Sequence, residues 1–353
     1  MITTEQAVLN SYRDTQMLVG GSLSEIVKHG NEIFKYYSGK HDRGYEKLRR
    51  EVTYLRALPA GVRERYPTII DVVDTPQIYG YKIPYYAGMV SLSDQLFSER
   101  DVEVSWKSLL SILDFMEDSH YRYMITTDGT DSYIDKIIHN RLTEAHDALR
   151  AIEPITSLLD GGKKMHDVTI MPLDDIRIAL RTDSFTNETL RPKHLHLFHG
   201  NFHMDNFLVN DESFMLIDPR GELLGSKLYD VCKLFVHMLI RYDEIHLDRF
   251  KLDKQSNEVL LTDERVGSRY DYMQQRYLEK CIADLGEEYF TKSLLLVGGA
   301  HAVSFASYHA RKPHPNYDRV NAYLTAGMLL LSAYIQDKTI DLSKPLFAYE
   351  AET

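Results

Sequence analysis

The chain has 353 residues, of which 44% are hydrophobic, so it is long enough to bury a large core in one domain or in two lobes. Its formal charge is −11, from 41 Lys and Arg against 52 Asp and Glu. A chain of net negative charge presents no global basic field, so we expect neither nucleic acid nor an anionic membrane surface as a partner. The sequence leaves the oligomeric state open.

Cysteine usage and the N-terminus indicate a compartment. Cys232 and Cys281 are the two cysteines of the chain, too few for a disulfide framework, and we expect both to be buried thiols in a reducing environment. The first 16 residues lack the charged start, apolar centre and cleavage site of an export signal. No uninterrupted apolar stretch approaches the roughly 20 residues that a spanning helix requires. We therefore expect a cytoplasmic protein.

The first hundred residues are predicted to be mostly strands. Apolar residues on both sides of a Gly-Gly turn indicate an antiparallel strand pair over 17–28, and a further strand is expected over 32–37. The tyrosine-rich segment 77–86 indicates a second strand pair. One helix interrupts this region, because apolar residues recur at helical spacing over 45–58 before Pro59.

Amphipathic helices dominate the rest of the chain. They are expected over 105–116, 133–152, 270–285 and 321–336. The exception is a hairpin, predicted because two short apolar runs, 207–209 and 214–217, flank the turn-rich Asn-Asp-Glu-Ser tetrapeptide.

The segments on either side of this hairpin carry the chemistry. His199-Gly200-Asn201-Phe202-His203-Met204-Asp205-Asn206 leads into it, and Ile217-Asp218-Pro219-Arg220-Gly221 follows it. A short hairpin returns the chain, so an amide oxygen from Asn206 and a carboxylate from Asp218 can face one ion. By itself Asp-Pro-Arg-Gly is typical of an ordinary turn, and the upstream loop is what makes it informative.

These two segments resemble the catalytic and metal-binding loops of the aminoglycoside phosphotransferase and choline kinase family, relatives of the protein kinases. The resemblance implies an α+β, bilobal protein-kinase-like fold, with a small β-rich nucleotide-binding lobe (1–88) and a larger, mainly helical catalytic and acceptor-binding lobe (89–353). It also implies an ATP- and Mg-dependent phosphotransferase acting on a small-molecule acceptor such as a sugar, an aminoglycoside or an amino alcohol.

The resemblance also implies residue roles. Asn206 and Asp218 would bind magnesium, and His199 would orient the catalytic loop. Lys35 would reach the α- and β-phosphates of ATP and pair with Glu51 on the following helix. The turn that covers the phosphates would be Gly20-Gly21-Ser22, and Pro84 to Gly88 would be the hinge that meets the adenine.

Asn201 departs from the family pattern, because it stands where the family has the catalytic Asp, and an amide cannot act as a general base. Three explanations remain open. Asp205 takes over the role of base, the protein is a nucleotide-binding pseudokinase with a regulatory or scaffold role, or the acceptor needs no deprotonation at this position.

Several other patterns leave alternatives open. The histidines between His194 and His203 favour a strand and loop over a zinc site, since no matching cysteines follow. Asp230 fits either a brace beneath the catalytic loop or a helix N-cap. The segment 301–314 fits an acceptor-site lining or a solvated helix end. Four acidic residues fit two alternatives, recognition of a cationic acceptor or simply a generally acidic surface. They are Glu117, Asp118, Asp128 and Asp131.

Overall fold

The structure is a computed structural model, and it describes residues 16–18, 24–38, 43–75, 77–126, 131–253 and 258–350. The chain forms two compact units. The first comprises Met1–Gln95, Lys107–Met124 and His196–Gly225, and the second comprises Leu96–Trp106, Ile125–Leu195 and Ser226–Thr353. Residues 199–206, the catalytic loop that the resemblance implies, therefore group with the N-terminal residues. The lobes predicted at 1–88 and 89–353 remain a prediction.

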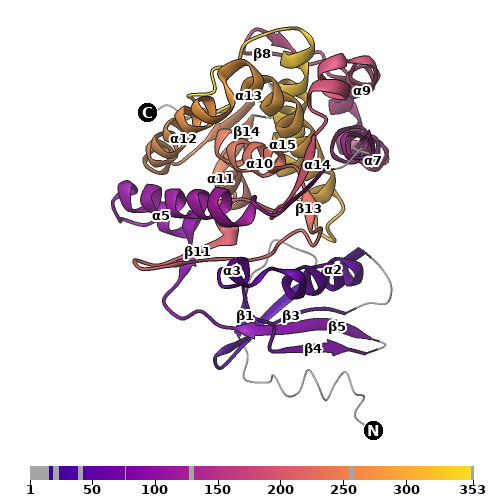
Figure 1. The fold of residues 1–353 in the computed structure, drawn as a ribbon. Helices are drawn as coiled ribbons and strands as arrows, with labels where there is room; N and C mark the ends of the chain where they lie inside the picture. Colours follow the sequence, from indigo (N-terminus) through magenta and orange to yellow (C-terminus); the bar gives the residue numbers. More distant parts are fainter. Residues whose placement is uncertain are drawn as a thin grey trace. The chain divides into compact units, whose positions relative to one another are not determined.

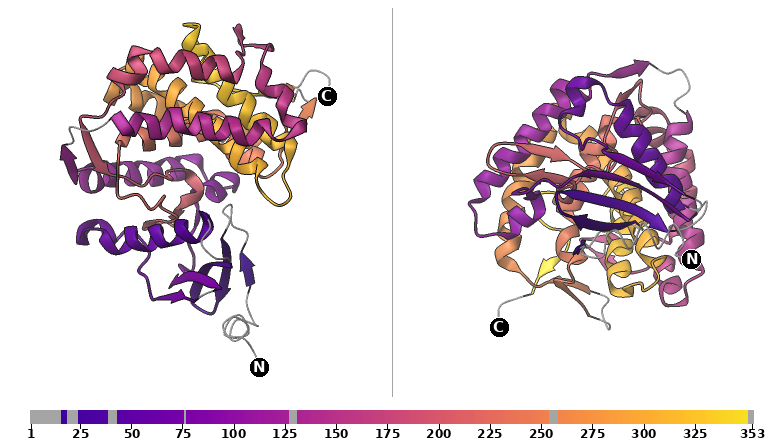
Figure 2. Two further views of the ribbon diagram at one scale, coloured as in Figure 1. Left: turned by 90° about the vertical axis from the view of Figure 1, so that its right-hand side faces the viewer. Right: turned by 90° about the horizontal axis from the view of Figure 1, so that it is seen from below.

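A five-stranded antiparallel sheet forms the N-terminal part of the first unit, and the right-hand view of Figure 2 shows it from below. Its order is β1 (Gln16–Leu18), β2 (Glu25–His29), β3 (Glu32–Ser38), β5 (Ile78–Pro84) and β4 (Asp71–Asp74). β3 is the central strand, paired with β2 on one side and β5 on the other. The strands predicted within 17–28 and 32–37 are confirmed. The strand pair predicted over 77–86 is wrong, because this segment forms the single strand β5, whose partners β3 and β4 lie outside it.

Alternation along β3 gives the sheet two different faces. Phe34 and Tyr36 are buried in a small apolar core with Val27 and Ile78. Because successive side chains of a strand point to opposite faces, Lys35 belongs to the other face. The side chain of Lys35 therefore points away from the apolar core that Phe34 and Tyr36 enter.

Helix α2 (Arg43–Ala57) packs on β3 and β5, as Figure 1 shows. Leu48, Val52 and Leu55 are buried on it at helical spacing, which confirms the helix predicted over 45–58. Glu51 shares this buried face and is completely inaccessible to solvent. A short helix, α3 (Ala60–Arg63), follows Pro59.

The predicted hairpin is confirmed. β11 (Phe207–Val209) and β12 (Phe214–Leu216) pair antiparallel, with Phe207 opposite Leu216. The side-chain oxygen of Asn210 accepts hydrogen bonds from the backbone N–H groups of Glu212 (3.0 Å) and Ser213 (2.8 Å) and closes the turn. β6 (Val90–Ser91) adds a third strand beside β11.

Shorter elements complete the first unit. Those that lie wholly in it are the π-helical turn η1 (Met116–His120), the 3-10 turn η5 (Met204–Asn206) and β13 (Leu224–Gly225). The division between the units falls within four further elements: α4 (Leu92–Phe97), α5 (Val102–Phe115), β7 (Met124–Thr126) and β10 (His194–Leu197). β10 pairs with β13, and the catalytic loop follows directly after β10.

The second unit is mainly helical. Its helices and helical turns are α6 (Asp131–Ile134), η2 (Asp135–His139), α7 (Asn140–Arg150), α8 (Glu153–Thr156), η3 (Ser157–Asp160), α9 (Leu173–Thr182), η4 (Phe185–Thr189), α10 (Lys227–Leu239), α11 (Tyr242–His246), α12 (Glu264–Leu285), α13 (Glu287–Ser293), η6 (Leu294–Gly298), α14 (Gly299–Ala310) and α15 (Tyr317–Ile335). Its strands are β8 (Lys164–Met165), β9 (Val168–Thr169), β14 (Phe250–Asp253), β15 (Glu258–Leu261) and β16 (Ala348–Tyr349). All four predicted helices are confirmed.

Close backbone packing joins α14 and α15, which lie side by side in Figures 1 and 2. A Cβ added at Gly327 would come within 2.6 Å of the backbone nitrogen of Val303. Glycine is therefore required at this crossing, because any side chain would push the two helices apart.

Both cysteines are buried free thiols, as predicted, Cys232 on α10 and Cys281 on α12. Burial raises the pKa of Cys281 to about 12, so the thiol stays protonated at neutral pH. Asp230 is not an N-cap, because Ser226 occupies that position and Asp230 lies buried in the first turn of α10. None of the helices in the described ranges is long and apolar enough to cross a membrane.

The two units together have the mixed composition that the sequence predicts. The first contains antiparallel sheets with one long helix, and the second is built mostly of helices. The fold class is therefore α+β, as predicted.

Candidate active site

Lys35 and Glu51 form the ion pair that the sequence predicts. The Lys35 ammonium lies 2.7 Å from a carboxylate oxygen of Glu51, and both side chains are almost completely buried. The pair forms because β3 directs Lys35 to the face that α2 covers, and Glu51 is on the buried side of α2. On the neighbouring strand β5, the hydroxyl of Tyr81 donates a 2.8 Å hydrogen bond to the same Glu51 oxygen.

Asp218 joins this pair from the end of the hairpin. Its carboxylate contacts the ammonium of Lys35 and lies 3.3 Å from that of Lys47 on α2. Lys47 is also 3.4 Å from Glu51, one helical turn further along. Two lysines and two carboxylates therefore form a compact network of zero net charge, which we call the charge network: Lys35, Lys47, Glu51 and Asp218.

The charge network keeps Asp218 and Lys35 ionised. Burial by itself would raise the pKa of Asp218, but Lys35 and Lys47 hold that pKa well below its usual value. Burial would lower the pKa of Lys35, and the charges of Asp218 and Glu51 instead keep it well above the usual value. At neutral pH the site thus holds a carboxylate beside an ammonium, the two charges that magnesium and phosphate groups bind.

Asn201 binds the same carboxylate from the catalytic loop. Its side-chain NH₂ donates a 2.8 Å hydrogen bond to Asp218 Oδ2 and a 3.0 Å hydrogen bond to the backbone oxygen of Asp218. An aspartate at position 201 could make neither bond in its ionised form, since a carboxylate only accepts. The residue that departs from the family pattern therefore holds the predicted metal ligand.

Asp218 is also held by its backbone, because its φ of +53° lies in the left-handed region. Aspartate is one of the few residues other than glycine that tolerate this conformation. Such local strain persists where the surrounding contacts fix the residue, as the charge network does here.

His199 connects the two segments that flank the hairpin. Its Nε2–H donates to the backbone oxygen of Ile217 at 3.0 Å, and its Nδ1 accepts from the backbone N–H of Asn201 at 3.2 Å. The backbone oxygen of His199 accepts from Arg220 N–H at 3.0 Å. These bonds tie the loop to both sides of Asp218, and one imidazole with its hydrogen on Nε2 makes the two that involve the ring.

Asn206 lies at the open end of the hairpin. Its backbone oxygen accepts from Ile217 N–H at 3.0 Å, which brings it next to the chain segment carrying Asp218. Its side-chain NH₂ donates to the backbone oxygen of Asn201 at 2.8 Å and to His203 Nε2 at 2.9 Å. Both amide hydrogens are thus used, and the side-chain oxygen is the part of Asn206 suited to a cation.

These two side chains fit magnesium better than zinc. An amide oxygen and a carboxylate are hard ligands, and magnesium is commonly held by one or two such groups together with water and phosphate oxygens. The described residues contain no cluster of three or more His, Cys, Asp or Glu side chains able to hold a metal. Binding at Asp218 would require its present partners, Lys35 and Lys47, to give way.

Asp205 occupies a different side of the loop. One carboxylate oxygen accepts a hydrogen bond from the Ser93 hydroxyl, and the other lies 4.0 Å from Nδ1 of His203. The Asp205 side chain is 38% exposed, so solvent reaches it. The role of Asp205 as the general base in place of residue 201 stays a prediction.

Sequence reasoning missed several residues of the site. Lys47 carried a usable signal, because it precedes Glu51 by one helical turn. Tyr81 and Ser93 carried none, since their contacts depend on tertiary packing. His203 belongs to the motif itself, and its contact with Asn206, three residues on, is local. The predicted phosphate-covering turn, Gly20-Gly21-Ser22, lies outside the described residues.

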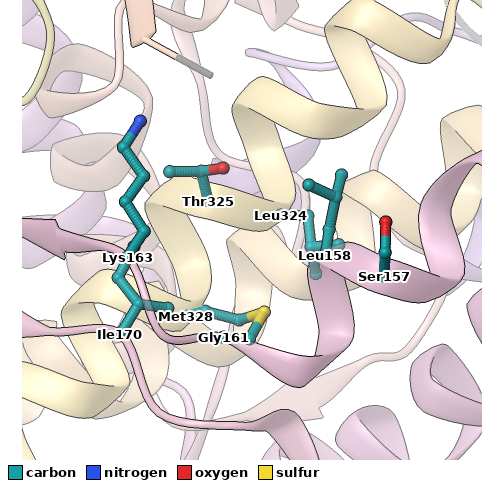
Figure 3. A pocket seen from close by; sticks show the side chains of 8 residues that line it. All are labelled: Ser157, Leu158, Gly161, Lys163, Ile170, Leu324, Thr325 and Met328. Carbon is teal, nitrogen blue, oxygen red and sulfur yellow. The ribbon is translucent and has the colours of Figure 1, made fainter. Parts of the chain in front are cut away.

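The second unit contains a cavity of about 140 Å³, shown in Figure 3. It is lined by Ser157, Leu158, Gly161, Lys163, Ile170, Leu324, Thr325 and Met328. None of these residues was predicted to bind an acceptor. In the segment 301–314, His301 and His309 are buried within the second unit, whereas Arg311 and His314, which follow the end of α14, are exposed.

Comparison with known proteins gives structural relatives only. No protein-family model matches the chain, and no curated protein matches it in sequence. Among solved structures, a glucosamine kinase in complex with glucosamine, ADP and inorganic phosphate aligns at 13% identity and a TM-score of 0.48, over 92% of this chain and 75% of that one.

Two further structures have similar scores. Choline kinase from Cryptosporidium parvum Iowa II has 14% identity and a TM-score of 0.46, over 95% of this chain and 91% of that one. Spectinomycin phosphotransferase APH(9)-Ia, in complex with ADP and spectinomycin, has 11% identity and a TM-score of 0.47, over 94% of this chain and 98% of that one. These proteins are of the kind that the sequence motif resembles. Similarity at this level transfers no residue role, ligand or substrate to the present chain.

Proposed function

We propose that the chain is a magnesium-dependent phosphotransferase that moves the γ-phosphate of ATP to a small-molecule acceptor, such as the hydroxyl of a sugar, an aminoglycoside or an amino alcohol. The observation that supports this best is the charge network, in which Asp218 meets two lysines beside Asn206 and Asn201. Positioned lysines for phosphate and oxygen ligands for magnesium are the recurring parts of phosphoryl-transfer sites.

In this proposal each member of the network has a defined task. Glu51 holds the Lys35 ammonium in place, and this ammonium binds the α- and β-phosphates of ATP. Asp218 and Asn206 hold the metal. Once the metal is bound to Asp218, Lys47 no longer pairs with this carboxylate and can bind phosphate oxygens instead. Magnesium, when bound, supplies positive charge that stabilises the phosphate oxygens during transfer.

Asn201 acts in this scheme as a donor that positions Asp218. General-base catalysis at this position is usually worth about a hundredfold or more, so its absence lowers the rate without abolishing transfer. Phosphoryl transfer passes through a loose transition state and depends mainly on positioning and electrostatics. Asp205 would accept the proton of the acceptor if a base is needed, and an already ionised acceptor would need none.

An ADP-release assay tests the proposal directly. The purified chain is given ATP and magnesium with a panel of sugars, aminoglycosides, amino alcohols and nucleosides, alongside Asp218→Ala and the surface variant Arg49→Ala. We expect one acceptor class to stimulate ADP release in the wild type and in Arg49→Ala, and Asp218→Ala to be inactive. Equal ADP release by Asp218→Ala would contradict the assignment of the site.

Asp205 has its own test in the same assay. If Asp205 is the base, Asp205→Ala lowers kcat for the stimulating acceptor by about a hundredfold while KM for ATP stays nearly constant. Unchanged kcat would eliminate the displaced base and leave an acceptor that needs no deprotonation.

A nucleotide-binding pseudokinase is the second candidate function. Asn201 favours it, because an amide cannot take the proton of an acceptor and here donates to Asp218. ATP binding by calorimetry without ADP release on any acceptor would support this candidate. Sustained ATP turnover that depends on one acceptor would rule it out.

We also propose a cytoplasmic location and a small molecule, not nucleic acid or a membrane, as the binding partner. Two buried free thiols and a charge of −11 support this setting. Fractionation of the native host cells tests the location.

A further inference from the structure

Three side chains of the first unit form a buried polar cluster, which we call the tyrosine–histidine cluster: Tyr54, Tyr66 and His120. Each is at most 1% exposed to solvent. Tyr54 is on α2, Tyr66 lies between α3 and β4, and His120 ends η1. Buried polar groups are costly unless they are hydrogen-bonded, so the bonds of this cluster reveal what it holds.

The bonds have a definite direction. His120 Nδ1 lies 2.9 Å from the backbone oxygen of Leu197, which can only accept, so Nδ1 carries the hydrogen. Burial lowers the pKa of His120 to about 4, so the ring is neutral and Nε2 is an acceptor. Tyr66 donates to Nε2 at 2.8 Å, and Tyr54 donates to the backbone oxygen of Phe198 at 3.0 Å. This assignment satisfies both hydroxyls and both ring nitrogens.

All of these contacts lead to the start of the catalytic loop. Leu197 and Phe198 are the two residues that precede His199, and both of their backbone oxygens are held by the cluster. The ring of Tyr66 also stacks on that of His199, with centroids 6.0 Å apart and planes at 27°. The cluster thus contacts three consecutive residues, Leu197, Phe198 and His199.

The same cluster reaches the phosphate-binding side of the site through α2. Tyr54 follows Glu51 by three residues and Lys47 by seven, so one rigid helix carries the partner of Lys35 and the donor to Phe198. A displacement of α2 would therefore move both parts of the site together.

We propose that Tyr54, Tyr66 and His120 are positioning residues that hold the catalytic loop in register with α2. This inference rests on the proposed function for its catalytic consequence, but its structural consequence does not. The cluster contacts no reacting group. It acts through His199, whose bonds to Asn201 and Ile217 place Asn201 and Asp218.

Hydrogen–deuterium exchange tests the proposal without any need for turnover. Tyr66→Phe and Tyr54→Phe each remove one hydroxyl and preserve the ring. The matched control is Tyr334→Phe, which removes a hydroxyl that donates to Asp183 at 2.8 Å in the second unit. We expect exchange in peptides covering 197–206 to accelerate about tenfold in the two cluster variants and to stay unchanged in the control.

Kinetics provide the second readout, with the acceptor found by the ADP-release assay. Misplacement of the loop should lower kcat/KM about tenfold or more in both cluster variants and leave it unchanged in Tyr334→Phe, because the loop contains Asn206 and its Asn201 holds Asp218. The double variant Tyr54→Phe/Tyr66→Phe should lose less than the product of the single losses, since both act through one cluster.

The outcomes separate this inference from the proposed function. Unchanged exchange over 197–206 in both cluster variants would overturn the positioning role, whatever the activity. Faster exchange in a protein that turns over no ATP would uphold the positioning role and contradict the proposed function instead. Equal acceleration in Tyr334→Phe would show a general loss of stability and would also overturn the proposal.

Discussion

At the scale of single residues, Asn201 contacts the charge network without adding a charge to it. The charge network of two lysines and two carboxylates is balanced, and an amide at position 201 adds hydrogen-bond donors without adding charge. An aspartate would bring a third carboxylate against Asp218. The amide is therefore suited to holding Asp218 before a metal binds.

The variant Asn201→Asp tests this balance. It removes both bonds from the side-chain NH₂ and places like charges together, so we expect the free energy of unfolding without magnesium to fall by about 1–3 kcal/mol. Magnesium should restore part of this loss, because the cation offsets the added carboxylate. Urea unfolding with and without magnesium measures it, with Asn210→Asp as the control, since its role as an acceptor persists in an aspartate. An equal effect of magnesium on the two variants would contradict the balance.

Lys47 is one of the two lysines that would compete with a metal for Asp218, and it is the more exposed of the two. It is 32% exposed and 3.3 Å from the carboxylate, so its attraction is partly screened by water. For Lys47→Met we expect affinity for Mn²⁺, used as a probe without nucleotide, to rise about two- to fivefold, because a competing charge is gone. Calorimetry measures the affinity, and Arg49→Met, on the exposed side of α2, is the control. Weaker Mn²⁺ binding by Lys47→Met would show that Lys47 supports the metal site.

The sequence identified residues of the site where the pattern is local. His199, Asn201, Asn206 and Asp218 lie in two short segments joined by a hairpin whose turn residues are visible in the sequence. The contact of Asp205 with Ser93 joins residues 112 positions apart and leaves no pattern along the chain. Burial of Glu51 likewise depends on the sheet that α2 covers.

At the scale of elements, the tight turn at Gly200 holds the catalytic loop. Its φ of +72° favours glycine, and an added Cβ would come within 2.8 Å of Arg220 Cβ and 3.1 Å of the Phe198 ring. We expect Gly200→Ala to lower the free energy of unfolding by about 1–3 kcal/mol. The control is Gly61→Ala, which has nothing within 4 Å and should be neutral or stabilising. Chemical denaturation of both variants measures the difference, and equal stability would contradict a strained turn.

A buried carboxyl in α11 makes the second unit sensitive to pH. Burial raises the pKa of Glu244 to about 7, against the lowering effects of Tyr349, whose hydroxyl donates to it at 2.8 Å, and of Arg241. The unfolded pKa is about 4.3, so the folded state binds more protons between these values, and stability falls as pH rises through about 7.

The variant Glu244→Gln should remove this dependence. It keeps an acceptor for Tyr349 and has no charge to desolvate, so we expect it to be more stable than the wild type at pH 8 by about 1–3 kcal/mol. Below about pH 4 the difference should vanish, since both proteins are then uncharged at this position. Denaturant unfolding across this range measures it. A constant difference between pH 4 and pH 8 would contradict a raised pKa.

Elements with strong local periodicity could be predicted, and elements defined by long-range pairing could not. The helix α2 and the hairpin β11–β12 follow from apolar spacing and turn residues. Strand β15 pairs with β16, which lies about ninety residues later. Periodicity along the chain contains no information about such partners.

At the scale of the whole molecule, the described parts of the predicted site lie in one compact unit. Segments from the N-terminal sheet, from α2 and from residues 196–225 contribute to it. The sequence resemblance predicted which residues belong together, whereas their assembly depends on the sheet, on α2 and on the tyrosine–histidine cluster. The roles of these residues in binding and transfer are proposals that rest on this assembly.

The central claim is that Lys35, Asn206 and Asp218 form a site for ATP and magnesium. Calorimetric titration of ATP, with and without magnesium, tests it most directly in the wild type, Asp218→Ala, Lys35→Met and the control Arg49→Met. We predict that magnesium tightens ATP binding in the wild type and in Arg49→Met, that Asp218→Ala loses this enhancement, and that Lys35→Met binds at least about tenfold more weakly. Equal ATP affinity in all four proteins, or an equal effect of magnesium on the wild type and Asp218→Ala, would contradict the claim.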